Sequence, residues 1–164
     1  MTTHAINTPA GPLAAGEQAP DFVVIDHKGD TVRLSDFLGK RAVVLFFYPK
    51  DDSPSCRREA CSFRDQYAAF QDAGAEVIGI NGDSAKSHQA FAEKRSLSYR
   101  LLTDIGGKVR KLYGVPALLG LFTHRVTFVI DRDGVIRHVV NSQAGSQRHV
   151  SEALETVKRI SAGE

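Results

Sequence analysis

The sequence has only two cysteines in 164 residues, too few for the disulfide framework of a small secreted protein. Its apolar runs are far shorter than the roughly 20 residues that a membrane-spanning helix needs. At a net charge of +2 it has no dense basic run of the kind that binds nucleic acid. Residues 1–15 also lack the charged and apolar regions of a signal peptide. We therefore expect a protein of a reducing compartment, without membrane or nucleic-acid partners, whose cysteines form a catalytic or sensing pair.

The spacing of the cysteines and histidines argues against several familiar sites. Cys56 and Cys61 match neither the Cys-x-x-Cys motif of thiol–disulfide oxidoreductases nor the Cys-x-x-x-Cys spacing of copper-delivery proteins. The six histidines contain no His-x-x-x-His pair, so we expect them at the surface, with only His124 near the functional site. We expect no metal and no cofactor.

The chain is organised around the stretch from Phe47 to Cys61. The apolar, β-branched run at residues 42–46 predicts a fully buried strand ahead of it. After it, apolar residues recur every three to four positions from Cys56 onward, which predicts a helix. Either Ser53 or Ser55 can cap this helix, and a proline at position 54 suits its first turn. Cys56 is therefore expected in the first turn of a helix.

This position favours a reactive thiolate. The unpaired N–H groups and the positive end of the helix dipole stabilise an anion there, and Arg57 and Arg58 add positive charge. Cys56 is thus a candidate nucleophile; the alternative is a small buried hydrophobic residue. On an intact helix the Cα atoms of Cys56 and Cys61 would lie about 8.7 Å apart, whereas a disulfide needs less than about 7 Å. If the two cysteines pair, the first turns must unwind.

The remaining pattern predicts one α/β domain. We expect a flexible N-terminal arm at residues 1–15 and a single domain at residues 16–164, with a mixed central sheet flanked by helices and an N-terminal β-hairpin extension. This is the thioredoxin-like order of elements. Strands are predicted at 22–25, 31–34, 42–47, 76–81, 101–103, 126–130 and 135–140, and helices at 54–73, 84–95, 107–113 and from a Ser146 cap onward. A short helical turn is expected at 36–38, capped by Ser35.

Several segments resemble one protein family. Residues 48–56, Tyr-Pro-Lys-Asp-Asp-Ser-Pro-Ser-Cys, resemble the peroxidatic loop of the peroxiredoxins. Glu59–Asp65 is similar to the PrxQ, or bacterioferritin comigratory protein, branch, in which a resolving cysteine follows the peroxidatic one by five residues. Gly16–Phe22 resembles the family's opening and Arg125–Asp131 its distal arginine strand, so the likeness spans most of the chain. It departs at position 53, where threonine is usual, and at position 55, where glycine is common.

The resemblance implies a thioredoxin-fold thiol peroxidase of the atypical 2-Cys kind. In such an enzyme Cys56 reduces hydrogen peroxide or an alkyl hydroperoxide and becomes a sulfenic acid, Cys61 resolves it as an intramolecular disulfide, and thioredoxin or a similar dithiol recycles it. The resemblance assigns transition-state stabilisation to Ser53 and Arg125 and shielding of the thiolate to Pro49. It also implies a monomer, in a bacterial cytoplasm or in a plastid-type compartment after removal of a transit peptide.

Other assignments stay open at this stage. The same residues suit a redox-switched binding module, whose disulfide would unfold a helix and expose a partner surface, or a thiol–disulfide oxidoreductase of the same fold. Arg57, Arg58 and Arg64 could tune the thiol or be ordinary surface charges. Glu59 could simply be a solvated first-turn acid favoured by the helix dipole.

Overall fold

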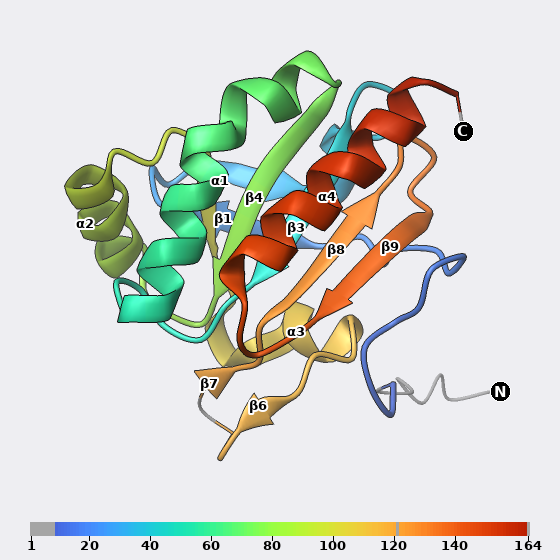
Figure 1. Cartoon of the computed structure of the whole chain (residues 1–164). Helices are drawn as coiled ribbons and strands as arrows, with labels where there is room; N and C mark the ends of the chain where they lie inside the picture. The colour runs from blue at the N-terminus through green and yellow to red at the C-terminus, as the bar shows by residue number, and fades with distance from the viewer. Residues whose placement is uncertain (1–8, 121, 164) are drawn as a thin grey trace, which may run out of the picture.

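The computed structural model describes residues 9–120 and 122–163. A seven-stranded mixed sheet, in the order β2-β1-β5-β4-β3-β8-β9, has helices on both faces (Figure 1). The strands are β1 Val23–Asp26, β2 Thr31–Arg33, β3 Ala42–Phe47, β4 Ala75–Asn81, β5 Arg100–Thr103, β6 Ala117–Leu118, β7 Phe122–Thr123, β8 Val126–Ile130 and β9 Ile136–Asn141. The α-helices are α1 Pro54–Asp72, α2 Ala85–Arg95, α3 Lys108–Leu112 and α4 Ser146–Ser161, and the 3-10 helices are η1 Leu34–Asp36 and η2 Ile105–Gly107.

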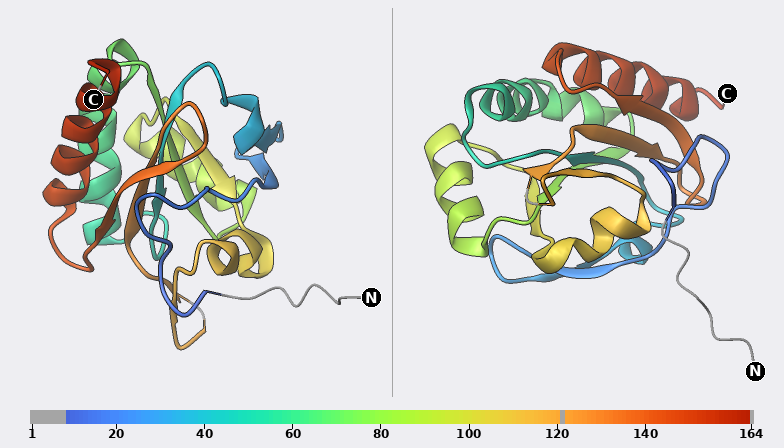
Figure 2. Two further views of the ribbon diagram at one scale, coloured as in Figure 1. Left: turned by 90° about the vertical axis from the view of Figure 1, so that its right-hand side faces the viewer. Right: turned by 90° about the horizontal axis from the view of Figure 1, so that it is seen from below.

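The central strand β3 is buried on both faces and so divides the interior into two cores. Successive side chains of a strand point to opposite faces. Val44 and Phe46 therefore join the core beneath α1, α2 and α4, whereas Leu45 and Phe47 join the core on the side of α3. Figure 2 shows α1 and α4 side by side on one face of the sheet and α3 on the other. Burial on both faces explains why this strand reads as an unbroken apolar run.

The sheet register brings two distant parts of the chain together. β3 pairs in parallel with β4 and antiparallel with β8, and Phe47 at the end of β3 lies opposite Val126 at the start of β8. The loop that leaves β3 towards Cys56 therefore begins beside the residue that precedes β8, Arg125. This edge is the carboxyl end of the parallel strands, where open α/β sheets form their sites.

The predicted thioredoxin-like α/β fold and most of its elements are confirmed, with the N-terminal hairpin at β1–β2. One element was missed and two local predictions were wrong. The β6–β7 pair was not predicted, the turn after β2 begins at Leu34 and not after Ser35, and α4 is capped by Gly145 with a φ of 82° in place of Ser146. Glycine reaches that left-handed conformation without the steric cost a side chain would bring.

The expected N-terminal arm is only partly within the described residues, since residues 1–8 lie outside them. In the described remainder, the backbone N–H of Leu13 donates to the carbonyl of Tyr113 at 3.0 Å, and its side chain packs against the α3-side core. Packing therefore begins ahead of Gly16, where the predicted domain starts. None of the helices among the described residues is long and apolar enough to cross a bilayer.

Candidate active site

Cys56 occupies the first turn of α1, as predicted. Ser53 is the N-cap residue, Pro54 opens the helix, and Cys56 is its third residue, with 1% of its surface exposed. The Ser53 hydroxyl donates to the carbonyl of Lys50 at 3.2 Å and caps no N–H of the helix. The N-cap side chain therefore leaves the N–H groups of the first turn free of a capping bond, in the place where a thiolate gains from them.

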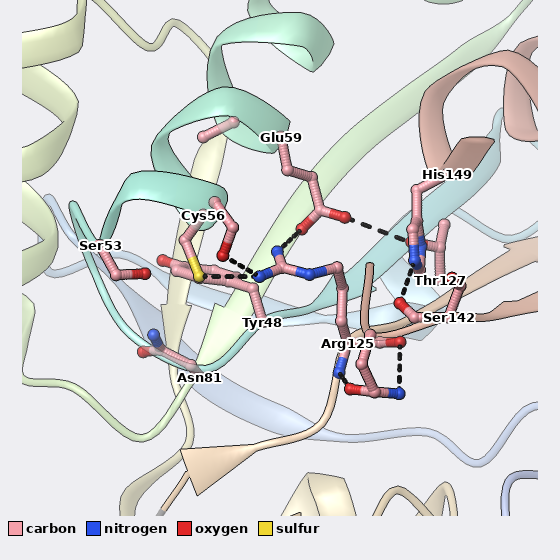
Figure 3. Close-up of polar contacts among 12 residues, drawn as sticks. Tyr48, Ser53, Cys56, Glu59, Asn81, Arg125, Thr127, Ser142 and His149 are labelled. Carbon is pink, nitrogen blue, oxygen red and sulfur yellow. Dashed lines mark hydrogen bonds and ion pairs between the residues drawn. The ribbon is translucent and has the colours of Figure 1, made fainter. Parts of the chain in front are cut away.

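Arg125 lies against this thiol, where the resemblance placed it. Its side chain is buried, and Nη2 donates to the Cys56 sulfur at 3.4 Å and to Oγ of Ser55 at 2.8 Å, while Nη1 donates to Oε1 of Glu59 at 2.9 Å (Figure 3). Its backbone is held as well, because its N–H donates to Oε1 of Gln143 at 2.7 Å. Among the described residues, this guanidinium is the only one hydrogen-bonded to the sulfur.

The prediction of a solvated Glu59 was wrong. Its side chain is fully buried and forms an ion pair with Arg125. Burial raises the pKa of Glu59 to about 7 from an ordinary 4.5, and the charge and hydrogen bond of Arg125 oppose that rise. Residues three apart on a helix share a face, so the spacing between Cys56 and Glu59 was the available signal that both face Arg125.

Two histidines expected at the surface are also fully buried, His88 and His149. His149 lies near the site: its Nδ1 is 2.8 Å from Oγ1 of Thr127 and 3.7 Å from Oε2 of Glu59, and Nε2 is 2.7 Å from the carbonyl oxygen of Ser142. Burial lowers the pKa of His149 to about 4, although the hydrogen bond to Ser142 opposes this. The histidine predicted near the site, His124, is half-buried.

A second network holds the loop on the other side of Cys56. Asp51 accepts hydrogen bonds from the Tyr48 hydroxyl at 2.6 Å and the Ser87 hydroxyl at 2.7 Å, and it lies 2.7 Å from Nδ1 of His88. Burial alone would raise the pKa of Asp51, but the hydrogen bonds from His88, Tyr48 and Ser87 lower it. The loop is thereby tied to α2, where Ser87 and His88 lie.

The other predicted residues are less closely engaged. Pro49 is half-buried in the loop, and Cys61 is half-buried in the second turn of α1, with both cysteines free. Of the arginines left open, Arg57 pairs with Asp52 at 3.3 Å, Arg64 pairs with a neighbouring aspartate, and Arg58 is exposed. Arg57 and Arg64 are thus held in ion pairs near the surface, whereas Arg58 lines a pocket together with Ser55 and Arg125.

The geometry defines a class of protein. No group of three or more metal-ligating side chains suited to an ion occurs in residues 9–120 and 122–163. The site combines a buried thiol at a helix N-terminus with the guanidinium of the residue that precedes β8, beside the carboxyl end of β3. Such an arrangement stabilises a thiolate and any negative charge that develops beside it. The fold and the site together define a thiol-based redox enzyme of thioredoxin-like fold.

Comparisons with known proteins identify the family. The AhpC/TSA family model matches residues 15–139. The chain is 46% identical to "Peroxiredoxin Q, chloroplastic" of Triticum aestivum over 92% of this chain and 69% of that protein. It is 49% identical to the protein of that name from Arabidopsis thaliana over 87% of this chain and 66% of that one. The crystal structure of peroxidoxin BcpB from Mycobacterium tuberculosis matches with a TM-score of 0.85 and 38% identity, over 90% of this chain and 98% of that one.

The chain therefore belongs to the AhpC/TSA family, within its peroxiredoxin Q branch. It is a thiol-dependent peroxidase, an oxidoreductase that takes a peroxide and a thiol reductant as substrates.

Proposed function

We propose that Cys56 is the peroxidatic and Cys61 the resolving cysteine of this peroxidase. The Cys56 thiolate attacks the terminal oxygen of a hydroperoxide, an S–O bond forms, and the O–O bond breaks. The sulfur loses two electrons and becomes a sulfenic acid, while the leaving oxygen takes a proton and departs as water or an alcohol. The Cys61 thiolate then attacks the sulfenic sulfur, releases hydroxide and forms a disulfide, which an external dithiol reduces by exchange.

The contact between Arg125 and Cys56 carries this proposal. A guanidinium donor 3.4 Å from the sulfur, with a second bond to Ser55, can stabilise both the thiolate and the peroxide oxygens that share its surroundings. The buried Glu59 holds the guanidinium of Arg125 in place, so the guanidinium needs little reorganisation when negative charge develops on the peroxide. Ser53 would act on the peroxide by its hydroxyl after leaving Lys50, and Pro49 would limit the access of water.

The resolving step requires a change in α1. Both cysteines lie in one unbroken helix, and Tyr99 donates a hydrogen bond to the carbonyl of Ala60, between them, at 2.7 Å. The pair is therefore expected to form a disulfide only after the first turns unwind. Unwinding would also carry the disulfide outward, towards a macromolecular reductant.

The proposal includes the reductant and the setting. We take thioredoxin or a similar dithiol protein as the reductant, a monomer as the working form, and no nucleic-acid partner, the last supported by a net charge of only +2. A plastid-type compartment is supported by relatives from Triticum aestivum and Arabidopsis thaliana whose names include "chloroplastic". A bacterial cytoplasm is the alternative.

The test is peroxide consumption in the presence of thioredoxin, its reductase and NADPH. Cys56→Ser should abolish turnover. Cys61→Ser should consume about one equivalent of peroxide and then stop as a sulfenic acid, which a dimedone adduct detects by mass spectrometry. If Cys61→Ser lost the first reduction while Cys56→Ser retained it, the roles of the two cysteines would be exchanged. Replacing thioredoxin with glutathione and glutaredoxin tests the choice of reductant separately.

A further inference from the structure

His149, in the first half of α4, makes two hydrogen bonds that fix its tautomer. Its Nε2 lies 2.7 Å from the carbonyl oxygen of Ser142, which can only accept, so Nε2 carries a proton. Nδ1 of the neutral ring is then the acceptor for the Thr127 hydroxyl, 2.8 Å away. Because burial holds the pKa of His149 near 4, the ring is neutral at pH 7.

The same ring covers the free side of Glu59. Oε1 of Glu59 holds Arg125, whereas Oε2 has no hydrogen-bond partner among the described residues and lies 3.7 Å from Nδ1 of His149. Figure 3 shows Cys56, Arg125, Glu59 and His149 in succession. The unprotonated Nδ1 donates nothing to this oxygen, which stays without a donor in the described part of the chain, at a cost. The ring instead occupies the space into which the carboxylate could turn away from the guanidinium.

Hydrogen bonds through the loop before α4 also connect His149 to the backbone of Arg125. The carbonyl that accepts from Nε2 belongs to Ser142, and the next residue, Gln143, accepts from the Arg125 N–H at 2.7 Å and donates to its carbonyl at 3.4 Å. The histidine thus supports the main chain of Arg125 by hydrogen bonds through this loop, and it confines the Glu59 carboxylate that holds the guanidinium by filling the space beside it.

We propose that His149 is a positioning residue for the Arg125 guanidinium in peroxide reduction. The inference rests on the proposed function, in which Arg125 acts on the peroxide. A residue that only supported the fold would need its bonds to Thr127 and Ser142 but would have no reason to affect the rate through Arg125. Coupling between the two residues is therefore the property that distinguishes the roles.

A double-mutant cycle tests this with stopped-flow rates of Cys56 oxidation by hydrogen peroxide. His149→Leu should slow oxidation about tenfold in the otherwise native protein and by less than about twofold in an Arg125→Ala background. His149→Gln should restore most of the rate, because its amide can donate to Ser142 in place of Nε2. Val157→Ala, at a buried position farther along α4, is the matched stability control and should lower the melting temperature without changing the rate.

Equal losses in the two backgrounds, or a native rate in His149→Leu, would overturn the inference while leaving the proposed function in place. A native rate in the single variant Arg125→Ala would instead remove the basis of the inference about His149 and of the proposed function. If His149→Leu does not fold, Thr127→Val, which removes the hydroxyl from Nδ1, should give a smaller loss that again depends on Arg125.

Discussion

Two buried carboxylates flank Cys56, and their surroundings differ. Asp51, in the loop before the helix, is bonded by Tyr48, Ser87 and His88. Glu59, one turn beyond the cysteine, is bonded by Arg125, and its other oxygen has no donor within the part of the chain that the structure describes. The pKa of Asp51 is accordingly lowered, whereas that of Glu59 is raised to about 7.

The difference separates a fixed side of the site from an adjustable one. Burial by itself destabilises a carboxylate, and only enough donors reverse that effect. Asp51, on the loop side, has enough donors, so it should stay charged and the loop should keep its shape at any physiological pH. On the other side, the guanidinium of Arg125 is shared between Glu59 and Cys56, so the charge of Glu59, which changes near pH 7, sets how firmly the guanidinium is held beside the sulfur.

Removing the shared guanidinium should have the largest effect. Arg125→Ala is expected to slow oxidation of Cys56 by about 100-fold or more, on the order of 3 kcal/mol, because it deletes a donor to the transition state. The control is Arg159→Ala, an exposed arginine near the end of α4 that pairs with Glu155, which should react at the native rate. Stopped-flow measurement with hydrogen peroxide compares the two, and similar rates for both variants would contradict a special role for Arg125.

Glu59→Gln should lower the oxidation rate about tenfold, since the amide holds the guanidinium without charge.

The pH dependence of stability gives a second measurement of the state of Glu59. Between about 4.5 and 7 the native state binds more protons at Glu59 than the unfolded state, so this residue makes stability fall as pH rises. His149, whose folded pKa is about 4 against an ordinary 6.5, makes stability rise with pH up to about 6.5.

Glu59 and His149 therefore change the free energy of unfolding with pH in opposite directions between about pH 4.5 and pH 6.5. In Glu59→Gln only the histidine slope remains, so the free energy of unfolding should increase more steeply with pH across this window than in the native protein. Urea titrations at pH 5 and pH 6.5 measure it. A smaller increase in the variant than in the native protein would mean that Glu59 is ionised throughout.

Asp51→Asn should act mainly on stability. The amide leaves His88 facing a weaker acceptor, at an expected cost of about 1–3 kcal/mol at pH 7. Because the folded pKa of Asp51 lies below its ordinary value of 3.8, its contribution is present above that value and lost as pH falls through the folded pKa. The difference in stability between the native and variant proteins should therefore shrink as pH falls below 3.8. A difference that stays constant on acidification would count against a charged Asp51 in this network. Peroxide oxidation should slow only a few-fold.

The smallest effect is expected at Asp52, which pairs with Arg57, Lys94 and Arg95 near the surface. Exposed pairs are worth little, typically below about 1 kcal/mol. Its φ of 58° lies in the left-handed region, which asparagine also tolerates, so Asp52→Asn removes the charge while keeping the backbone. We expect a melting temperature within about 3 °C of the native one, and a much larger drop would show that this cluster holds the helix start.

The local part of this site could be predicted from the sequence, because the apolar run of the strand, the Ser53–Pro54 start and the helical spacing that follows fix where Cys56 lies. Arg125 could be placed only by family resemblance, since it meets Cys56 across 69 residues of chain. Glu59 and His149 were assigned to the surface because their burial depends on α4 packing over α1, a contact no local pattern reports. The two-residue strands β6 and β7 are too short to show any periodicity.

The central claim is that Cys56 cannot pair with Cys61 until the start of α1 opens. Amide hydrogen exchange across residues 50–66, in the reduced protein and in the disulfide form confirmed by mass spectrometry, tests it most directly. The account predicts that oxidation removes protection from the first two turns of α1, while the amides of α2, on the fixed side, keep theirs. Equal protection of residues 54–62 in both forms would contradict it, because the disulfide would then have formed within an intact helix.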